Sequence, residues 1–175
     1  PQTSLVKNYK EPTQNVYNNP KKRKMSFHMF KECIDKLPPH VRIDFSGMSE
    51  PFENSECMDF INYALTKQNK VAIYTTLSGI SKKNTDELVK LLKNNRFHEF
   101  VIHLPDDTGN MRGFKLNEDY LYALEKLVPV SKKTMTMSKD AKIDPELLKK
   151  IKGLKKNKSL LKKLPKDSFI GWTRA

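Results

Sequence analysis

Residues 41–51 read VRIDFSGMSEP and combine a strand pattern with a polar turn. The apolar residues Val41, Ile43 and Phe45 predict a short strand. Proline lacks an N–H and restricts the residue before it, so Glu50-Pro51 ends that strand. Ligands of parallel α/β sheets bind at the carboxyl ends of the strands. The segment 46–51 is therefore a candidate ligand edge, although an ordinary strand-to-helix turn uses the same residue types.

Two further stretches repeat the pattern of a strand followed by a helix. KVAIYTT (70–76) and FHEFVIHL (97–104) predict strands, so the three strands start near 41, 70 and 99, about 29 residues apart. Helices are expected over about 26–37, after a cap at Ser55, over about 83–94 with Asn84 or Thr85 as cap, and over about 117–127. One helix between successive strands is typical of a parallel sheet built from βα units.

The chain beyond these units predicts a fourth strand at 133–137 (KTMTM) and a helix that begins at Asp144-Pro145. Three parts follow from composition: an extended lead-in at 1–24, an α/β core at 25–138, and a lysine-rich helical segment with the start of a further strand at 139–175.

The formal charge of +13 is concentrated at the two ends of the chain. Residues 41–138 carry thirteen basic and thirteen acidic side chains, whereas 1–40 carry eight and three and 139–175 carry twelve and four. Non-specific contact with a polyanion is therefore expected through 149–166, and a generally lysine-rich proteome would give the same composition. Sequence-specific base readout is poorly supported, because arginines are few and no aromatic residues are interleaved with the lysines.

The two cysteines, Cys33 and Cys57, each fall in a helical pattern and form no CxxC or Cys/His cluster. This usage favours packed thiols in a reducing cytoplasm over a disulfide framework or a local zinc site. No apolar run approaches membrane-spanning length.

The order of these motifs resembles the radical S-adenosylmethionine (radical SAM) superfamily. Gly47-Met48-Ser49-Glu50-Pro51 is similar to the GGEP-like motif of that family, and Thr75-Thr76-Leu77-Ser78-Gly79 to its TNG-like motif. Residues 172–175 (WTRA) look like the start of an SRAGN-type motif, which occurs in members with an additional cluster domain. The resemblance covers most of 20–127 and implies a partial (β/α) barrel with parallel strands.

The resemblance also implies a cofactor site at the carboxyl ends of the strands. In the family the backbone of the GGEP-like segment binds the amino group of SAM, which points to Gly47, Met48, Ser49 and Glu50. Thr75, Thr76 and Ser78 are similarly placed for ribose or carboxylate contacts. His103 and Asp106, at the end of the third strand, would face the same cavity, and Arg112 and Lys115 follow in the next loop. A histidine at a strand end is more often structural than catalytic.

One defining feature of the family is missing from this sequence. The CxxxCxxC loop, whose three thiolates hold a [4Fe-4S] cluster, does not occur. We therefore expect an interior segment of a longer enzyme that acts on an unknown substrate, or a degenerate relative without a cluster. In either case the isolated chain is expected to lack the redox activity. A cluster-free α/β binding module and a basic nucleic-acid-associated protein remain as alternatives.

Overall fold

Strands and helices alternate along the part of the chain that the computed structural model describes, which is residues 24–47, 49–109, 111, 114–136 and 141–153. The elements, in chain order, are α3 (Phe27–Asp35), β1 (Arg42–Phe45), η2 (Pro51–Glu53), α4 (Cys57–Thr66), β2 (Lys70–Thr75), α5 (Lys82–Leu91), β3 (Phe97–Leu104), α6 (Glu118–Leu127), η3 (Val128–Val130), β4 (Lys133–Thr136) and α7 (Pro145–Gly153).

The four strands form one parallel sheet in the order β1-β2-β3-β4. Ile43 pairs with Val71 in the first strand pair. In the last pair His103 lies opposite Met135, so the predicted fourth strand is confirmed. The parallel pairing of consecutive strands, predicted from the spacing of the βα units, is confirmed as well. The structure is thus α/β with a parallel sheet, and its described strands do not close into a barrel.

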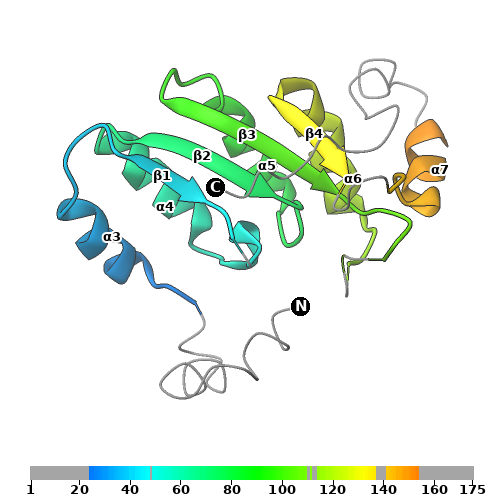
Figure 1. Cartoon of the computed structure of the whole chain (residues 1–175), viewed down its shortest axis with the longest axis horizontal. Coiled ribbons are helices and arrows are strands. Elements are labelled where there is room, and N and C mark those ends of the chain that lie inside the picture. The colour runs from blue at the N-terminus through cyan, green and yellow to red at the C-terminus, as the bar shows by residue number, and fades with distance from the viewer. Residues whose placement is uncertain (1–23, 48, 110, 112–113, 137–140, 154–175) are drawn as a thin grey trace.

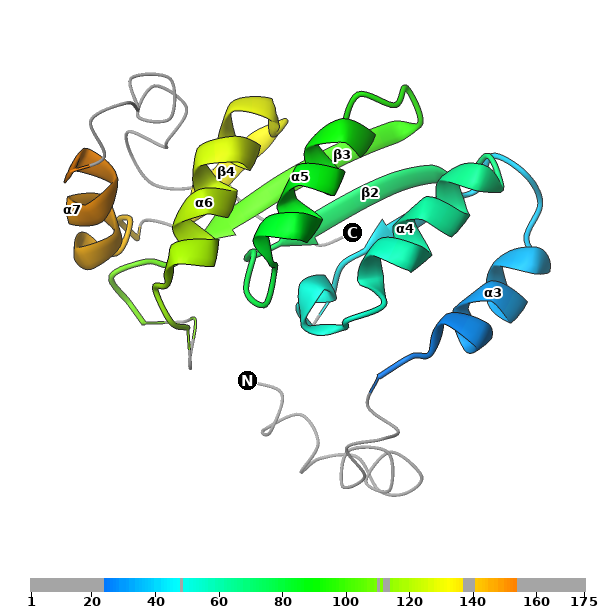
Figure 2. The same cartoon turned by 180° about the vertical axis from the view of Figure 1, so that it is seen from behind.

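The helices α4, α5 and α6 all lie on one face of this sheet. Figure 1 shows the sheet in front of the three helices, and Figure 2 shows the same helices in front of the sheet. The main core fills the space between them, where Ile73 and Ile102 from the strands and Leu88 from α5 are fully buried. A separate small cluster of Val101 and Met135, with Tyr74 packed against it, lies apart from that core.

Of the predicted helix caps, one is confirmed and those of α4 and α5 are not. Ser26 caps α3 as predicted, since its Oγ accepts a hydrogen bond from the Met29 N–H at 3.2 Å. Two other predicted caps are wrong. Ser81, not Asn84 or Thr85, caps α5 by accepting from the Asn84 N–H at 3.2 Å. The cap residue of α4 is Glu56, not Ser55, and it makes no side-chain cap bond.

Several predictions concern residues outside the described part of the chain. These are the lead-in at 1–23, Met48, Arg112, the lysine-rich stretch from 154 onward, and the final strand and WTRA motif. Among the described helices, none has the length and apolar character needed to cross a membrane.

Candidate functional site at the carboxyl edge of the sheet

Glu50 joins the ends of β1 and β2. One carboxylate oxygen, Oε1, accepts a hydrogen bond from Thr75 Oγ1 at 2.5 Å. The other, Oε2, accepts from both the backbone N–H and the hydroxyl of Thr76, each at 2.6 Å. A further backbone donor is the Phe52 N–H, at 3.3 Å from Oε1. We call Glu50, Thr75 and Thr76 the glutamate clamp, because it ties the loop after one strand to the end of the next.

Two effects act in opposite directions on the pKa of Glu50. Burial raises this pKa, because the charged carboxylate loses hydration, and the hydrogen bonds from Thr75, Thr76 and Phe52 lower it; burial is the larger effect. A carboxylate accepting this many bonds is held in one orientation. Its role in this structure is therefore to position two loops, and the oxygen atoms are already occupied by protein donors.

The residues just before the clamp are open to solvent. Gly47 has a positive φ of 112°, a conformation that side chains rarely adopt, and a Cβ added there would meet nothing within 4 Å. Ser49 is exposed, and Met48 lies outside the described residues. Among the described residues, none blocks the approach of a molecule to the backbone of Gly47.

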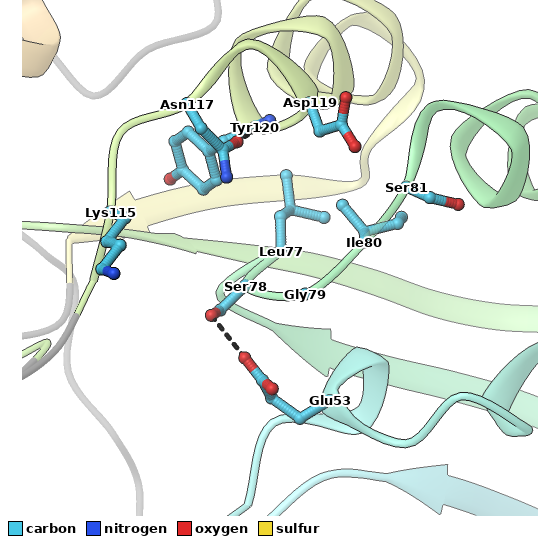
Figure 3. A pocket seen from close by; sticks show the side chains of 10 residues that line it. All are labelled: Glu53, Leu77, Ser78, Gly79, Ile80, Ser81, Lys115, Asn117, Asp119 and Tyr120. Carbon is cyan, nitrogen blue, oxygen red and sulfur yellow. Dashed lines mark hydrogen bonds between the residues drawn. The ribbon is translucent and has the colours of Figure 1, made fainter.

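Ser78 lies on the other side of the clamp and is paired with a residue the sequence analysis did not select. Its hydroxyl donates to Glu53 Oε1 at 2.8 Å. Both residues line a pocket of about 310 Å³ that also receives the start of α6 (Figure 3). We call it the Ser78 pocket. Glu53 and Tyr120 could not be found from spacing, because they reach this pocket from η2 and α6.

A second, larger hollow of about 690 Å³ lies on the β1 side of the edge, between α3 and β1. Its lining is mostly apolar and includes Phe30, Ile43 and Phe45. Both cysteines also line it, Cys33 exposed and Cys57 buried. Cys33 lies on α3 and Cys57 on α4, as the helical patterns predict, and Cys57 lies near the carboxyl edge of the sheet. This residue starts α4, which begins at that edge, and it shares the hollow with Glu50.

The chemistry of Cys57 is that of a packed thiol. Burial, and then the charge of Glu50, raise the pKa of its thiol to about 12. The described residues include no cluster of three or more His, Cys, Asp or Glu side chains that could hold a metal ion.

His103 and Asp106 do not join the clamp. Ile102 and Leu104 pack in the core against the helices, so His103 between them lies on the opposite face of β3. It is buried, and burial together with the charge of Lys133 lowers the pKa of its imidazole to about 4. Asp106 is occupied in a turn, where its Oδ1 accepts from the Thr108 N–H and hydroxyl. Of the residues predicted at this edge, the clamp thus brings together Glu50, Thr75 and Thr76, and His103 lies on the face of β3 opposite the helices.

Comparison of the chain with protein-family models, with curated proteins and with solved structures found no match.

Proposed function

We propose that this chain is a segment of a radical SAM enzyme that binds SAM at the Gly47–Glu50 edge. In this proposal the [4Fe-4S] cluster is held by cysteines outside the chain, and the radical acts on a substrate that this segment does not define. SAM bound to such a cluster would supply the radical chemistry. The observation that carries the proposal is the glutamate clamp.

The clamp supports the proposal because it connects the two segments on which the resemblance rests. Gly47–Pro51 and Thr75–Gly79 are distant in sequence, yet Glu50 accepts three hydrogen bonds from Thr75 and Thr76. Glu50 is half-buried, and its hydrogen bonds hold the two segments in a fixed relative position at the carboxyl ends of β1 and β2. The contact also leaves the backbone around Gly47, and not the Glu50 side chain, as the group that can accept the SAM ammonium.

The arrangement of the sheet supports the barrel type of α/β fold. A doubly wound sheet reverses its strand order and has helices on both faces. Here the order follows the chain and α4, α5 and α6 share one face (Figure 2). This arrangement results when each right-handed crossover places the next strand on the same side of the one before it. A sheet built in this way becomes a (β/α) barrel when its first and last strands pair. We infer that the described sheet is one part of such a barrel.

The position of α3 adds a second argument for a partial barrel. Among the described strands β1 has a neighbour on one side only, and α3 lies beyond it (Figure 1). A further parallel strand beside β1 would be covered by α3, and the apolar hollow lined by Phe30, Ile43 and Phe45 would receive its side chains. Such a strand would bring the loop at its carboxyl end next to Gly47.

The described residues fit SAM better than they fit the cluster. The edge offers an open glycine backbone and the exposed Ser49 for a polar ligand. A cluster needs thiolates close together, whereas the two cysteines are one exposed and one buried, and the pKa of the buried thiol is raised. We therefore assign the cluster ligands to polypeptide outside this chain and derive no step from the cluster.

Equilibrium dialysis with labelled SAM tests the proposal on matched glycine variants. Gly47→Ala and Gly109→Ala both place a side chain at a positive φ where a Cβ meets nothing within 4 Å. Gly109, with φ of 67°, lies in the left-handed region that side chains sometimes adopt, whereas Gly47, with φ of 112°, lies outside it, so Gly47→Ala carries more backbone strain. The thermal midpoint of each variant is therefore measured beside its SAM affinity, and only Gly47 belongs to the proposed site. We expect Gly47→Ala to weaken SAM binding about tenfold, equal to about 1.4 kcal/mol, and Gly109→Ala to leave it unchanged. Equal effects of the two variants, or no SAM binding by the unsubstituted chain, would contradict the proposal.

A further inference from the structure

The Ser78 pocket is lined by groups that attract an anion and by groups that attract a cation. Lys115 and the residues that cap two helices, Ser81 of α5 and Asn117 of α6, lie on its wall. Helix N-termini carry partial positive charge and favour a carboxylate or another anion. Glu53 and Asp119 line the same pocket, and carboxylates favour an ammonium group. A simple anion would be attracted by Lys115 and the helix N-termini alone, and a simple cation by the carboxylates alone.

The hydroxyl of Tyr120 is buried beside the pocket. Tyr120 is 3% exposed, and its OH makes no hydrogen bond among the residues that the structure describes. Figure 3 shows this hydroxyl directed toward the side of the pocket where Lys115 lies. Burying a hydroxyl without a partner is unfavourable, so buried polar atoms nearly always have one. A polar atom of a bound ligand, or a water held by that ligand, would complete the bonding of Tyr120.

The size and floor of the pocket limit the ligand further. A volume of about 310 Å³ corresponds to a small organic molecule. Leu77 and Ile80 are buried and provide apolar surface beneath the polar groups. Gly79, with φ of 78°, allows the loop to pass closely, because a Cβ there would lie 2.9 Å from the Phe52 carbonyl oxygen.

We propose that the Ser78 pocket binds the zwitterionic group of an α-amino acid. Lys115 and the N-terminus of α6 at Asn117 would bind its carboxylate, Glu53 would bind its ammonium, and Leu77 and Ile80 would contact its side chain. The group can come from a free amino acid or from the amino-acid end of SAM. The proposal does not rest on SAM binding at the Gly47–Glu50 edge. The amino-acid end of one SAM molecule cannot occupy both sites, so SAM bound only in the Ser78 pocket would support this proposal and contradict that placement.

Amide NMR titration of the chain tests this site by comparing L-methionine with analogues that lack either its ammonium or its carboxylate. L-Methionine should shift the Ser78, Gly79 and Asn117 amides, while N-acetylmethionine, without the ammonium, and methionine methyl ester, without the carboxylate, should do so at least about tenfold more weakly. Shifts of the same amides by SAM would identify its amino-acid end as a source of the group. Equal shifts by all three methionine compounds, no shift with any, or shifts by 5′-methylthioadenosine, which has no amino-acid group, would overturn the proposal.

Variants separate binding from folding. Lys115 is exposed, so Lys115→Met should fold normally and lose about tenfold in affinity for L-methionine, whereas Lys93→Met, at another exposed lysine, should lose none. Tyr120→Phe should bind L-methionine less tightly while keeping or raising the thermal midpoint of the free chain, because it removes an unpaired hydroxyl. Unchanged affinity in both Lys115→Met and Tyr120→Phe would overturn the assignment of the pocket.

Discussion

Glu50 is the residue on which the local structure of the edge depends most. Its carboxylate accepts four hydrogen bonds, and a side chain that cannot accept them leaves the Thr75 and Thr76 donors unpaired. We expect Glu50→Ala to lower the free energy of unfolding by about 2–4 kcal/mol. Glu50→Gln keeps one acceptor oxygen and removes a half-buried charge, so its loss of unfolding free energy should be under about half of that value. Urea denaturation of both variants measures the difference, and equal losses would show that the acceptor oxygens do not stabilise the edge.

His103 should make the stability of the fold depend on pH. Its pKa is lowered from 6.5 to about 4 by burial and by Lys133, so the folded state binds fewer protons than the unfolded state in this range. Stability is therefore complete above about pH 6.5 and falls as the pH drops toward 4, by up to about 3 kcal/mol. His103→Gln should lack this component. Urea denaturation at pH 7 and pH 4.5 checks it, and an equal pH dependence in the variant would assign the effect to other groups.

At the scale of single elements, Ser81, which caps α5, can be compared with Ser55, which the sequence predicts as the cap of α4. Ser81 Oγ accepts the Asn84 N–H, whereas α4 has no side-chain cap bond at its start. We expect Ser81→Ala to reduce the free energy of unfolding by about 1 kcal/mol and Ser55→Ala by no more than about 0.5 kcal/mol. Thermal denaturation distinguishes the two. A larger loss of unfolding free energy from Ser55→Ala than from Ser81→Ala would show that Ser55 caps α4, as the sequence predicts.

The elements themselves were predictable, and the contacts between them were not. Periodic apolar positions located the four strands and the helices between them, because the hydrophobic pattern is set by the faces each element buries. The wrong cap at α5 arose because Ser81, Asn84 and Thr85 are all suitable residue types, and backbone geometry decides among them. The polar residues that follow the predicted strands indicated at which edge of the sheet the candidate site lies. The pairing of Glu53 with Ser78 depends on how η2 packs against the β2–α5 loop, which spacing does not encode.

At the scale of the whole molecule, the proposal separates SAM binding from cluster binding. Cys33 and Cys57 should not assemble iron and sulfide, since one is exposed on α3 and the pKa of the other is raised to about 12. Anaerobic reconstitution of the chain should give no stoichiometric cluster absorbance, and Cys33→Ala and Cys57→Ala should change nothing. If the chain does assemble a cluster, and either variant abolishes it, the assignment of the cluster to polypeptide outside this chain is wrong.

The most direct test of the central claim is to map SAM on the chain by amide NMR. Titration with SAM should shift the Gly47, Ser49 and Thr76 amides, and Glu50→Gln, which keeps an acceptor for the clamp, should retain these shifts. The Gly109 amide, in the loop after β3, serves as an internal reference and should not move. Shifts confined to the Ser78 pocket would support an amino-acid site and contradict SAM binding at the clamp. No shift at Gly47, Ser49 or Thr76 at any SAM concentration would contradict the proposed function.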